Sequence, residues 1–295
     1  MRRNSPDSLT GFVNIDKSPD MTSSDVVCIV RGVLSRLIGG KQKAGHLGTL
    51  DPQATGVLPV ALGKATALFD LLAFKTKRYT AEFVFGRTTD TLDRAGAFLP
   101  ATGRIPEREE VESVLARFVG DIEQVPPAYS AKSVDGKRAY AYARQGVQLA
   151  LPARKVRIVS LSLTGGEKGR FMFDVECGGG TYIRALARDI AEALGTVGYM
   201  SALRRTRSGV FAIEDAVDID EFRRAPEEHI LPVEYALGGF PSVTVDGEEE
   251  KRITNGIPLK GKGVKEGEYC TVYAPDRLLG VGLAGKDGLR LGVRL

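Results

Sequence analysis

Cysteine and histidine are scarce in this chain of 295 residues, and their scarcity excludes several kinds of site. The three cysteines, Cys28, Cys177 and Cys270, are widely spaced, odd in number and form no CxxC motif. This pattern argues against a disulfide framework and a zinc site, and it suits a reducing cytoplasm. The two histidines, His46 and His229, are too few for a histidine-based triad or a metal cluster. We therefore expect no bound metal.

Long apolar runs are also missing. No stretch approaches the length that a membrane-spanning helix needs, and no apolar run follows the basic residues of the N-terminal MRRNSPDSLTG. We therefore expect no membrane span and no signal peptide, and we expect a cytoplasmic protein. The hydrophobic fraction of 43% and the charged fraction of 26% are ordinary for a soluble globular protein. The length favours two domains over one.

The charges are unevenly distributed, although the net charge is only +4. Residues 132–170 hold nine Lys or Arg residues against two acids, and residues 31–50 hold four basic residues and no acid. Such segregation indicates either a basic face for a polyanion such as RNA or ordinary solvated surface charge. The charge pattern alone leaves both interpretations open.

The segment 44–66 reads AGHLGTLDPQATGVLPVALGKAT and is the most informative part of the chain. It places Asp51 in a loop that is rich in glycine and proline. Glycine permits unusual backbone angles and proline fixes its own, so we expect a stiff, sharply bent loop. Such a loop can aim one carboxylate as a nucleophile or as a general acid or base. Alternatively, Asp51 is a turn residue or helix cap before Pro52.

The window GHxGTLDPxATGVLPV resembles the catalytic motif of the TruB family, the bacterial tRNA pseudouridine-55 synthases. A match over so many consecutive positions is far more specific than a pattern such as GxGxxG. The resemblance implies that Asp51 is the essential aspartate of the family and acts as the nucleophile. It also implies that His46 enters the disrupted RNA loop and stacks there, whereas a histidine in such a loop is otherwise a surface residue.

Pseudouridine formation breaks the N-glycosidic bond of a uridine and rejoins the base through carbon. This isomerisation needs no metal, redox cofactor or external energy source, so we expect no cofactor. Carboxylates typically perform glycosidic chemistry because they stabilise or trap an electron-poor sugar carbon. Asp51 can fill that role, and whether it attacks the sugar or the base stays open.

Two further motifs resemble those of the same family. Tyr79 ends a KRY element, and the resemblance places it on the extruded base, where its hydroxyl can move a proton. It is otherwise a strand tyrosine packed in the core. The segment GTYIR ends at Arg184, which we expect in the first turn of a helix, able to pair with Asp51 and orient it. Tyr182 of the same motif would line the pocket.

The remaining matches concern the pocket and the RNA. Leu203 matches a pocket leucine of the family, although plain core packing also explains it. Residues 88–93 (TTDTLD) resemble the RTDTxD segment, and residues 125–146 resemble the PxxYSAxxxxGxxxYxxARxG block. The second block lies in the basic stretch, so RNA contacts are predicted for Lys132, Lys137 and Arg138. The chain departs from the family at residues 17–20, which read KSPD in place of Lys-Pro-x-Gly, and at residues 178–179.

The pattern of expected elements predicts an α+β fold, a mixed and largely antiparallel sheet with flanking helices. Strands are expected at 11–16, 78–86, 129–134, 155–163 and 170–177, and helices at 25–38, 64–74, 107–118 and 181–194. Ser23 or Ser24 is expected to cap the first of these helices. We expect a catalytic domain over 1–238 and a small β domain over 239–295. The NGIP sequence at 255–258 resembles the turn of RNA-binding PUA domains, and an unrelated β appendage is the alternative.

The sequence therefore predicts a tRNA pseudouridine synthase that works as a monomer and acts on the T stem-loop. The tip of the T-loop is single-stranded, so its bases can be splayed and read. The target base would be flipped into a pocket lined by Tyr79, Tyr182 and Leu203. Two other classes stay open. A tRNA-binding or RNA-folding protein would keep the basic stretch with an idle Asp51, and a nucleoside or sugar hydrolase would use Asp51 on a small molecule.

Overall fold

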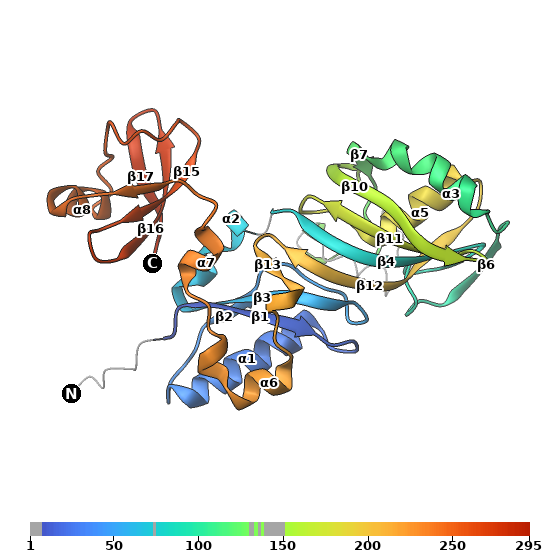
Figure 1. The fold of residues 1–295 in the computed structure, drawn as a ribbon, viewed down its shortest axis with the longest axis horizontal. Coiled ribbons are helices and arrows are strands. Elements are labelled where there is room, and N and C mark those ends of the chain that lie inside the picture. The colour runs from blue at the N-terminus through green and yellow to red at the C-terminus, as the bar shows by residue number, and fades with distance from the viewer. Residues whose placement is uncertain (1–7, 73–74, 130–132, 135–136, 139–150) are drawn as a thin grey trace.

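The computed structural model describes residues 8–72, 75–129, 133–134, 137–138 and 151–295. One large mixed sheet with flanking helices forms most of this structure, and a separate four-stranded sheet lies at its C-terminal end (Figure 1). Among the described strands of the large sheet, every pairing is antiparallel except that of β3 with β12. The predicted α+β fold with a largely antiparallel sheet is therefore confirmed.

The large sheet has nine strands, seven of which run in the order β1-β3-β12-β4-β11-β10-β7. In that order they span Gly11–Lys17, Thr55–Leu62, Gly198–Ser208, Lys77–Phe85, Arg170–Cys177, Arg154–Glu167 and Gly120–Gln124. The short strands β2 (Ala44–His46) and β13 (Phe211–Ala212) pair with β3 and β12. Strands β3 and β4, which follow each other in the chain, are thus separated by β12, which comes from much later in the sequence.

One face of the central strands forms the main core. Strand β4 buries alternate side chains, Tyr79, Ala81, Phe83 and Phe85, and β11 does the same from Phe171 to Cys177. Helices α3 (Arg108–Leu115) and α5 (Ile183–Ala193) cover this face, while α1 (Ser23–Leu37) and α6 (Ile219–Arg224) lie beside β1 (Figure 1). Alternation with a period of two places one set of side chains against the helices, as the sequence predicts.

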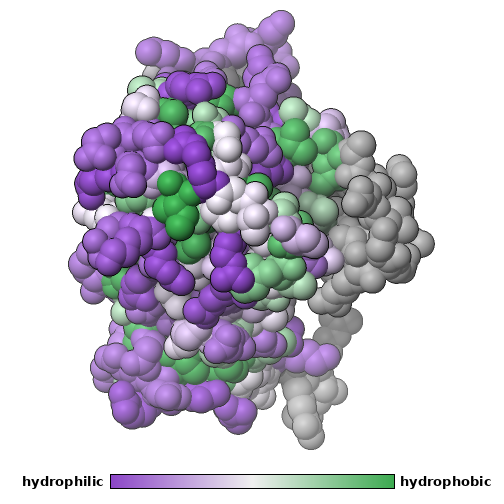
Figure 2. Space-filling view, turned by 90° about the vertical axis from the view of Figure 1, so that its right-hand side faces the viewer, coloured by the Kyte–Doolittle hydropathy of each residue, from purple (hydrophilic) through white to green (hydrophobic). Residues whose placement is uncertain are grey.

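The remaining elements are short. They are α2 (Phe69–Leu72), α7 (Val233–Leu237), the hairpin strands β5 (Arg87–Thr89) and β6 (Phe98–Thr102), and β8 (Ser133–Val134) with β9 (Lys137–Arg138). The helix predicted over 64–74 is instead a 3-10 turn at Gly63–Leu68 followed by α2, with residues 73–74 outside the described part. At the end of the molecule that carries β6, Figure 2 shows a mainly hydrophilic surface with separate apolar groups.

The C-terminal sheet has a core of its own. Its strands run in the order β14-β15-β16-β17 and span Ser242–Thr244, Tyr269–Tyr273, Leu278–Gly285 and Gly288–Arg294. Helix α8 (Gly247–Thr254) packs Ile253 among Val243, Val245 and Val272. The predicted turn at 255–258 ends this helix, with Gly256 at a φ of 81°, where glycine is favoured. The likeness to PUA domains stays a prediction.

Two local predictions near the N-terminus were wrong. The cap of α1 is Thr22, whose side chain accepts a hydrogen bond from the Asp25 amide, and neither Ser23 nor Ser24 caps the helix. The segment from Gly45 to Pro59 is not one loop, because β2 and the buried strand β3 occupy both of its ends. Strand β3 reads TGVLPVAL, and its glycine and proline conceal the β pattern.

Asp20 adopts an uncommon backbone conformation in the turn between β1 and α1. Its φ of 61° lies in the left-handed region, where a Cβ atom is disfavoured, and the family motif has glycine there. We expect Asp20→Gly to raise the free energy of unfolding by about 0.5–1 kcal/mol, because relief of this strain exceeds the entropy that glycine adds to the unfolded chain. Urea denaturation would measure the change. Asp20→Ala keeps the Cβ atom and should give no gain; an equal gain would contradict the explanation.

Candidate active site

The loop that carries Asp51 joins β2 to β3 and is fixed on both sides of the aspartate. The Ser23 hydroxyl donates to the Leu50 carbonyl at 2.9 Å and accepts from the Leu50 amide at 2.8 Å. The Lys17 ammonium donates to the Pro52 carbonyl at 2.9 Å and also to the carbonyls of Ser18 and Met21. The residues before and after Asp51 are therefore anchored to the β1–α1 region, which holds the carboxylate in place.

Arg184 lies in the first turn of α5 and pairs with Asp51. Its Nε atom lies 2.9 Å from Oδ2 of Asp51, and its Nη1 and Nη2 atoms donate to the carbonyls of Thr91 and Tyr129 at 3.0 Å each. The arginine side chain is only 8% exposed, whereas that of Asp51 is 32% exposed. The carboxylate is thus held from the buried side and remains open to a substrate on the other.

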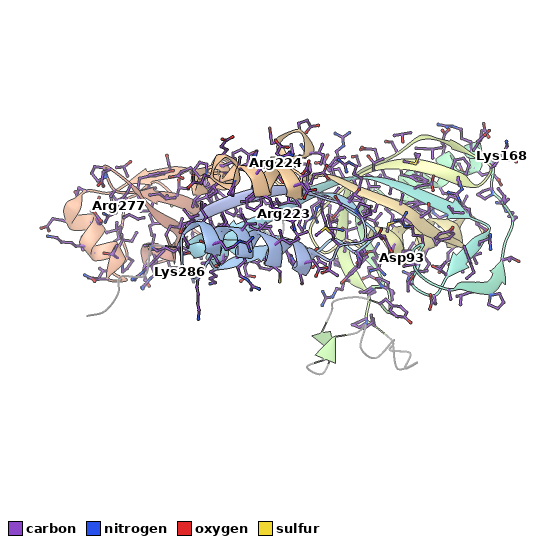
Figure 3. The ribbon with its side chains drawn as sticks, turned by 90° about the horizontal axis from the view of Figure 1, so that it is seen from below. Asp93, Lys168, Arg223, Arg224, Arg277 and Lys286 are labelled. Carbon is purple, nitrogen blue, oxygen red and sulfur yellow. The ribbon has the colours of Figure 1, made fainter. Side chains whose placement is uncertain are left out.

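Asp93 is a second acidic partner of Arg184 that we did not single out from the sequence. Its Oδ2 atom lies 3.6 Å from Nη1 of Arg184, and its Oδ1 atom accepts from the Thr91 hydroxyl at 2.7 Å and the Ala95 amide at 3.0 Å. In Figure 3, Asp93 lies away from both ends of the molecule, between Lys168 at one end and Arg277 and Lys286 towards the other. The two acids of the segment 88–93, Asp90 and Asp93, were a possible signal, because a buried arginine needs more than one acceptor.

Tyr79 lies on β4 and is buried on the helix-covered face of the sheet. It faces Val175 of β11 on one side and Arg205 of β12 on the other. Burial raises the pKa of its phenol, while the charge of Arg205 and a hydrogen bond with it act in the opposite direction. Because burial dominates, Tyr79 is protonated at neutral pH and offers a proton next to the site. It also packs in the core, so both interpretations of this tyrosine are compatible with its position.

The other predicted pocket residues come from three different elements. His46 ends β2 and is half-buried, and burial together with the charge of Arg205 lowers its pKa, so its ring is neutral at physiological pH. Tyr182 caps α5, and its amide donates to Oε1 of Gln124 at 2.8 Å. Leu203 pairs with Ala81 in the sheet and packs partly buried against the core.

The predicted RNA-contacting residues of the basic stretch cannot be placed with their side chains. Lys132 lies outside the described residues. Lys137 and Arg138 form β9, which pairs with β8, but their side chains are outside the description. Their contact with RNA stays a prediction.

Buried cations outnumber buried acids around the Asp51 loop. Lys17, Lys77, Arg184 and Arg205 are all at most 8% exposed. Burial lowers the pKa of Lys17 to about 8 and that of Lys77 to about 8, the charge of Arg205 adding to the effect on both. Within the described part of the chain, no group of three or more His, Cys, Asp or Glu side chains gathers where it could hold a metal ion.

The lowered pKa of Lys17 predicts a rise in stability at alkaline pH. The folded protein releases this proton at about pH 8, and the unfolded chain releases it near 10.5. Below pH 8 both states are protonated, so the free energy of unfolding should rise only between pH 8 and 10.5, by on the order of 3 kcal/mol.

Urea denaturation of wild type and Lys17→Met at pH 7.5, 9 and 10 would measure this rise, which should be smaller in the variant. Lys77 titrates in both proteins, so the variant should retain part of the rise. Equal pH dependence in both proteins would contradict the prediction.

Comparison with known proteins gives the family. Residues 36–183 match the family described as "TruB family pseudouridylate synthase (N terminal domain)", and residues 184–238 match "tRNA pseudouridylate synthase B C-terminal domain". The chain belongs to the TruB family. It is therefore a pseudouridine synthase, an RNA-binding enzyme that isomerises uridine in tRNA.

Similar proteins cover nearly the whole chain. The chain is 43% identical to the tRNA pseudouridine synthase B of Caulobacter sp. (strain K31) over 261 residues, which cover 86% of this chain and 83% of that protein. It is 39% identical to the tRNA pseudouridine synthase B of Caldanaerobacter subterraneus over 287 residues, 96% of this chain and 98% of that protein. The TruB family membership thus rests on relatives of about the same length.

Solved structures show a similar fold. A chain of a Cbf5-Nop10-Gar1 complex is 30% identical with a TM-score of 0.71, and the match covers 94% of this chain and 78% of that one. A chain of an H/ACA RNP bound to a substrate RNA containing 2'-deoxyuridine is 29% identical with a TM-score of 0.69 at the same coverages.

Among the described residues of this TruB family member, no helix is long and apolar enough to cross a membrane.

Proposed function

We propose that this enzyme converts uridine 55 in the T-loop of tRNA to pseudouridine, with Asp51 as the nucleophile on a flipped-out base. The ion pair of Asp51 with Arg184 at 2.9 Å is the observation that carries the proposal. It fixes a carboxylate that is 32% exposed, while the loop is anchored on both sides by Ser23 and Lys17. A carboxylate held in this way can attack without first reorganising its surroundings.

The reaction exchanges one bond of the base for another. The bond between N1 and C1′ breaks, a bond between C5 and C1′ forms, C5 loses its proton and N1 gains one, so the atoms balance without a co-reactant. Asp51 attacks the sugar or the base and is released again as a carboxylate once the bond between C5 and C1′ has formed, and Arg184 orients it. Tyr79, protonated and buried beside the site, assists the transfer of the proton.

The flipped base lies in a pocket lined by Tyr79, Tyr182 and Leu203, and the neutral ring of His46 stacks in the vacated RNA loop. Residues 1–238 act as the catalytic domain and residues 239–295 as a PUA-like RNA-binding domain. The basic stretch with Lys132, Lys137 and Arg138 holds phosphates, so the affinity for tRNA should fall as salt rises. The protein works as a monomer in the cytoplasm. The substrate RNA of the structurally similar H/ACA RNP supports an RNA substrate for this fold.

Tritium release to water from a tRNA transcript labelled at uridine C5 tests the proposal. We expect one equivalent per tRNA, because each isomerisation expels one C5 hydrogen. A matched transcript with cytidine at position 55 should release none. Release from both transcripts would contradict the T-loop position. Tight, salt-sensitive binding without release from either transcript would favour the tRNA-binding protein, and cleavage of free uridine would favour the hydrolase.

A further inference from the structure

Arg205 lies behind the active site and is deeply buried. It comes from β12 and is 1% exposed, the largest of the fully buried side chains in the described chain. Its Nε atom donates to the Val57 carbonyl at 2.7 Å, and its Nη2 atom donates to the Gly48 carbonyl at 3.0 Å. Among the described residues, no carboxylate lies within 4.0 Å of it. Burial of an unpaired charge is costly, so its presence here calls for a role.

Two glycines of the motif around Asp51 lie against this arginine. Gly56 pairs with Arg205 in the parallel register of β3 and β12, and its φ is 98°. Any side chain at Gly56 would collide with the Arg205 backbone. At Gly48, whose φ is 140°, a Cβ atom would lie 3.6 Å from Nη1 of Arg205. Gly56 therefore lets β3 approach the Arg205 backbone closely, and Gly48 lies beside the guanidinium.

Arg205 also reaches the tyrosine. Tyr79 is its register partner on the neighbouring strand β4, and the charge of Arg205 acts on the phenol. One guanidinium thus donates to the start of the Asp51 loop at Gly48 and to strand β3 at Val57, and it comes from the residue paired with Tyr79 in the sheet. Its planar group of donors suits such simultaneous contacts, which the single ammonium of lysine cannot reproduce.

We propose that Arg205 is a positioning residue of the reaction, which holds the Tyr79 hydroxyl in a fixed place relative to the Asp51 loop and eases the movement of its proton. The inference rests on the proposed function, in which Tyr79 assists proton transfer. Arg205 itself is too deeply buried to touch the substrate and acts through Tyr79. A neighbouring cation stabilises the phenolate and lowers the pKa of the phenol, which offsets part of the increase that burial causes.

Paired variants test this coupling. Arg205→Lys should slow single-turnover tritium release by about a hundredfold with tRNA affinity nearly unchanged, because it loses the positioning but keeps a charge. In a Tyr79→Phe background, the same change should cost little more, since the two residues act as one unit. Fully additive losses in the double variant would overturn the inference.

Arg204→Lys is the matched control. This neighbour on β12 points to the other side of the strand and pairs with Asp16 at 2.7 Å, with a side chain that is 43% exposed. We expect wild-type rates from it. A loss as large as that of Arg205→Lys would show that any change in this strand disturbs the site, and would overturn the specific role of Arg205.

The ionisation of Tyr79 gives a readout that does not depend on activity. Protein labelled with fluorotyrosine shows each phenol by ¹⁹F NMR, and Tyr79→Phe identifies the resonance. In Arg205→Gln, which keeps donors but loses the charge, this phenol should ionise at higher pH, and in Arg204→Gln it should not move. An unchanged titration in Arg205→Gln would overturn the inference, even in an active enzyme. A shifted titration together with an inactive wild type would support the coupling and defeat the proposed function.

Discussion

Asp51→Asn should abolish tritium release from labelled tRNA, with a loss of at least about ten-thousandfold in single-turnover rate. An amide is nearly the same size as a carboxylate but is not a nucleophile, so the loop should keep its shape while the attack is lost. The contacts of Ser23 with Leu50 and of Lys17 with Pro52 do not involve the Asp51 side chain. We therefore expect the variant to fold normally.

The binding of tRNA separates a chemical role from a structural one. Filter retention of labelled tRNA by Asp51→Asn should match that of wild type, because we expect phosphate contacts away from the carboxylate to supply most of the binding energy. Asp70→Asn, on helix α2, is a suitable control and should keep full activity. Turnover by Asp51→Asn at a rate near that of wild type would contradict the assignment of Asp51 as the nucleophile.

Arg184→Met should lower both activity and stability. The arginine contacts Asp51 and Asp93 and donates to the carbonyls of Thr91 and Tyr129. Its removal leaves the buried carboxylate of Asp93 without a cation, which we expect to reduce the free energy of unfolding by about 3–5 kcal/mol. Urea denaturation would measure the loss.

Arg184→Lys separates the two effects. It keeps the charge but cannot reach all four acceptors at once, so stability should largely recover while the rate stays about a hundredfold below wild type. The control is Arg188→Lys, one turn further along α5, where the arginine contacts Asp189 and the Val125 carbonyl. Equal activity of Arg184→Lys and wild type would show that the charge alone suffices and that the orientation of Asp51 is not limiting.

The residues that hold the site in place were harder to predict than those within motifs. Ser23 was interpreted as a possible helix cap, yet its hydroxyl fixes Leu50. Lys17 lies in the segment where the chain departs from the family pattern, and its role depends on three carbonyls that only folding brings together. The contacts of Lys17 with Pro52 and of Asp93 with Arg184 join residues 35 and 91 positions apart, separations that local patterns do not encode.

Features that depend on near neighbours in the chain could be predicted from the amino-acid sequence alone. Alternation along β4 and β11 gave the strands, and the glycines and prolines around Asp51 gave a bent loop, because period and backbone preference are local properties. The consecutive match to a family motif indicated the chemistry. Which side chains meet could be seen only in the folded chain. Strand β12 enters between β3 and β4, and this order places Arg205 against both the Asp51 loop and Tyr79. Such contacts arise from the order of strands in the sheet, which no short stretch of sequence specifies.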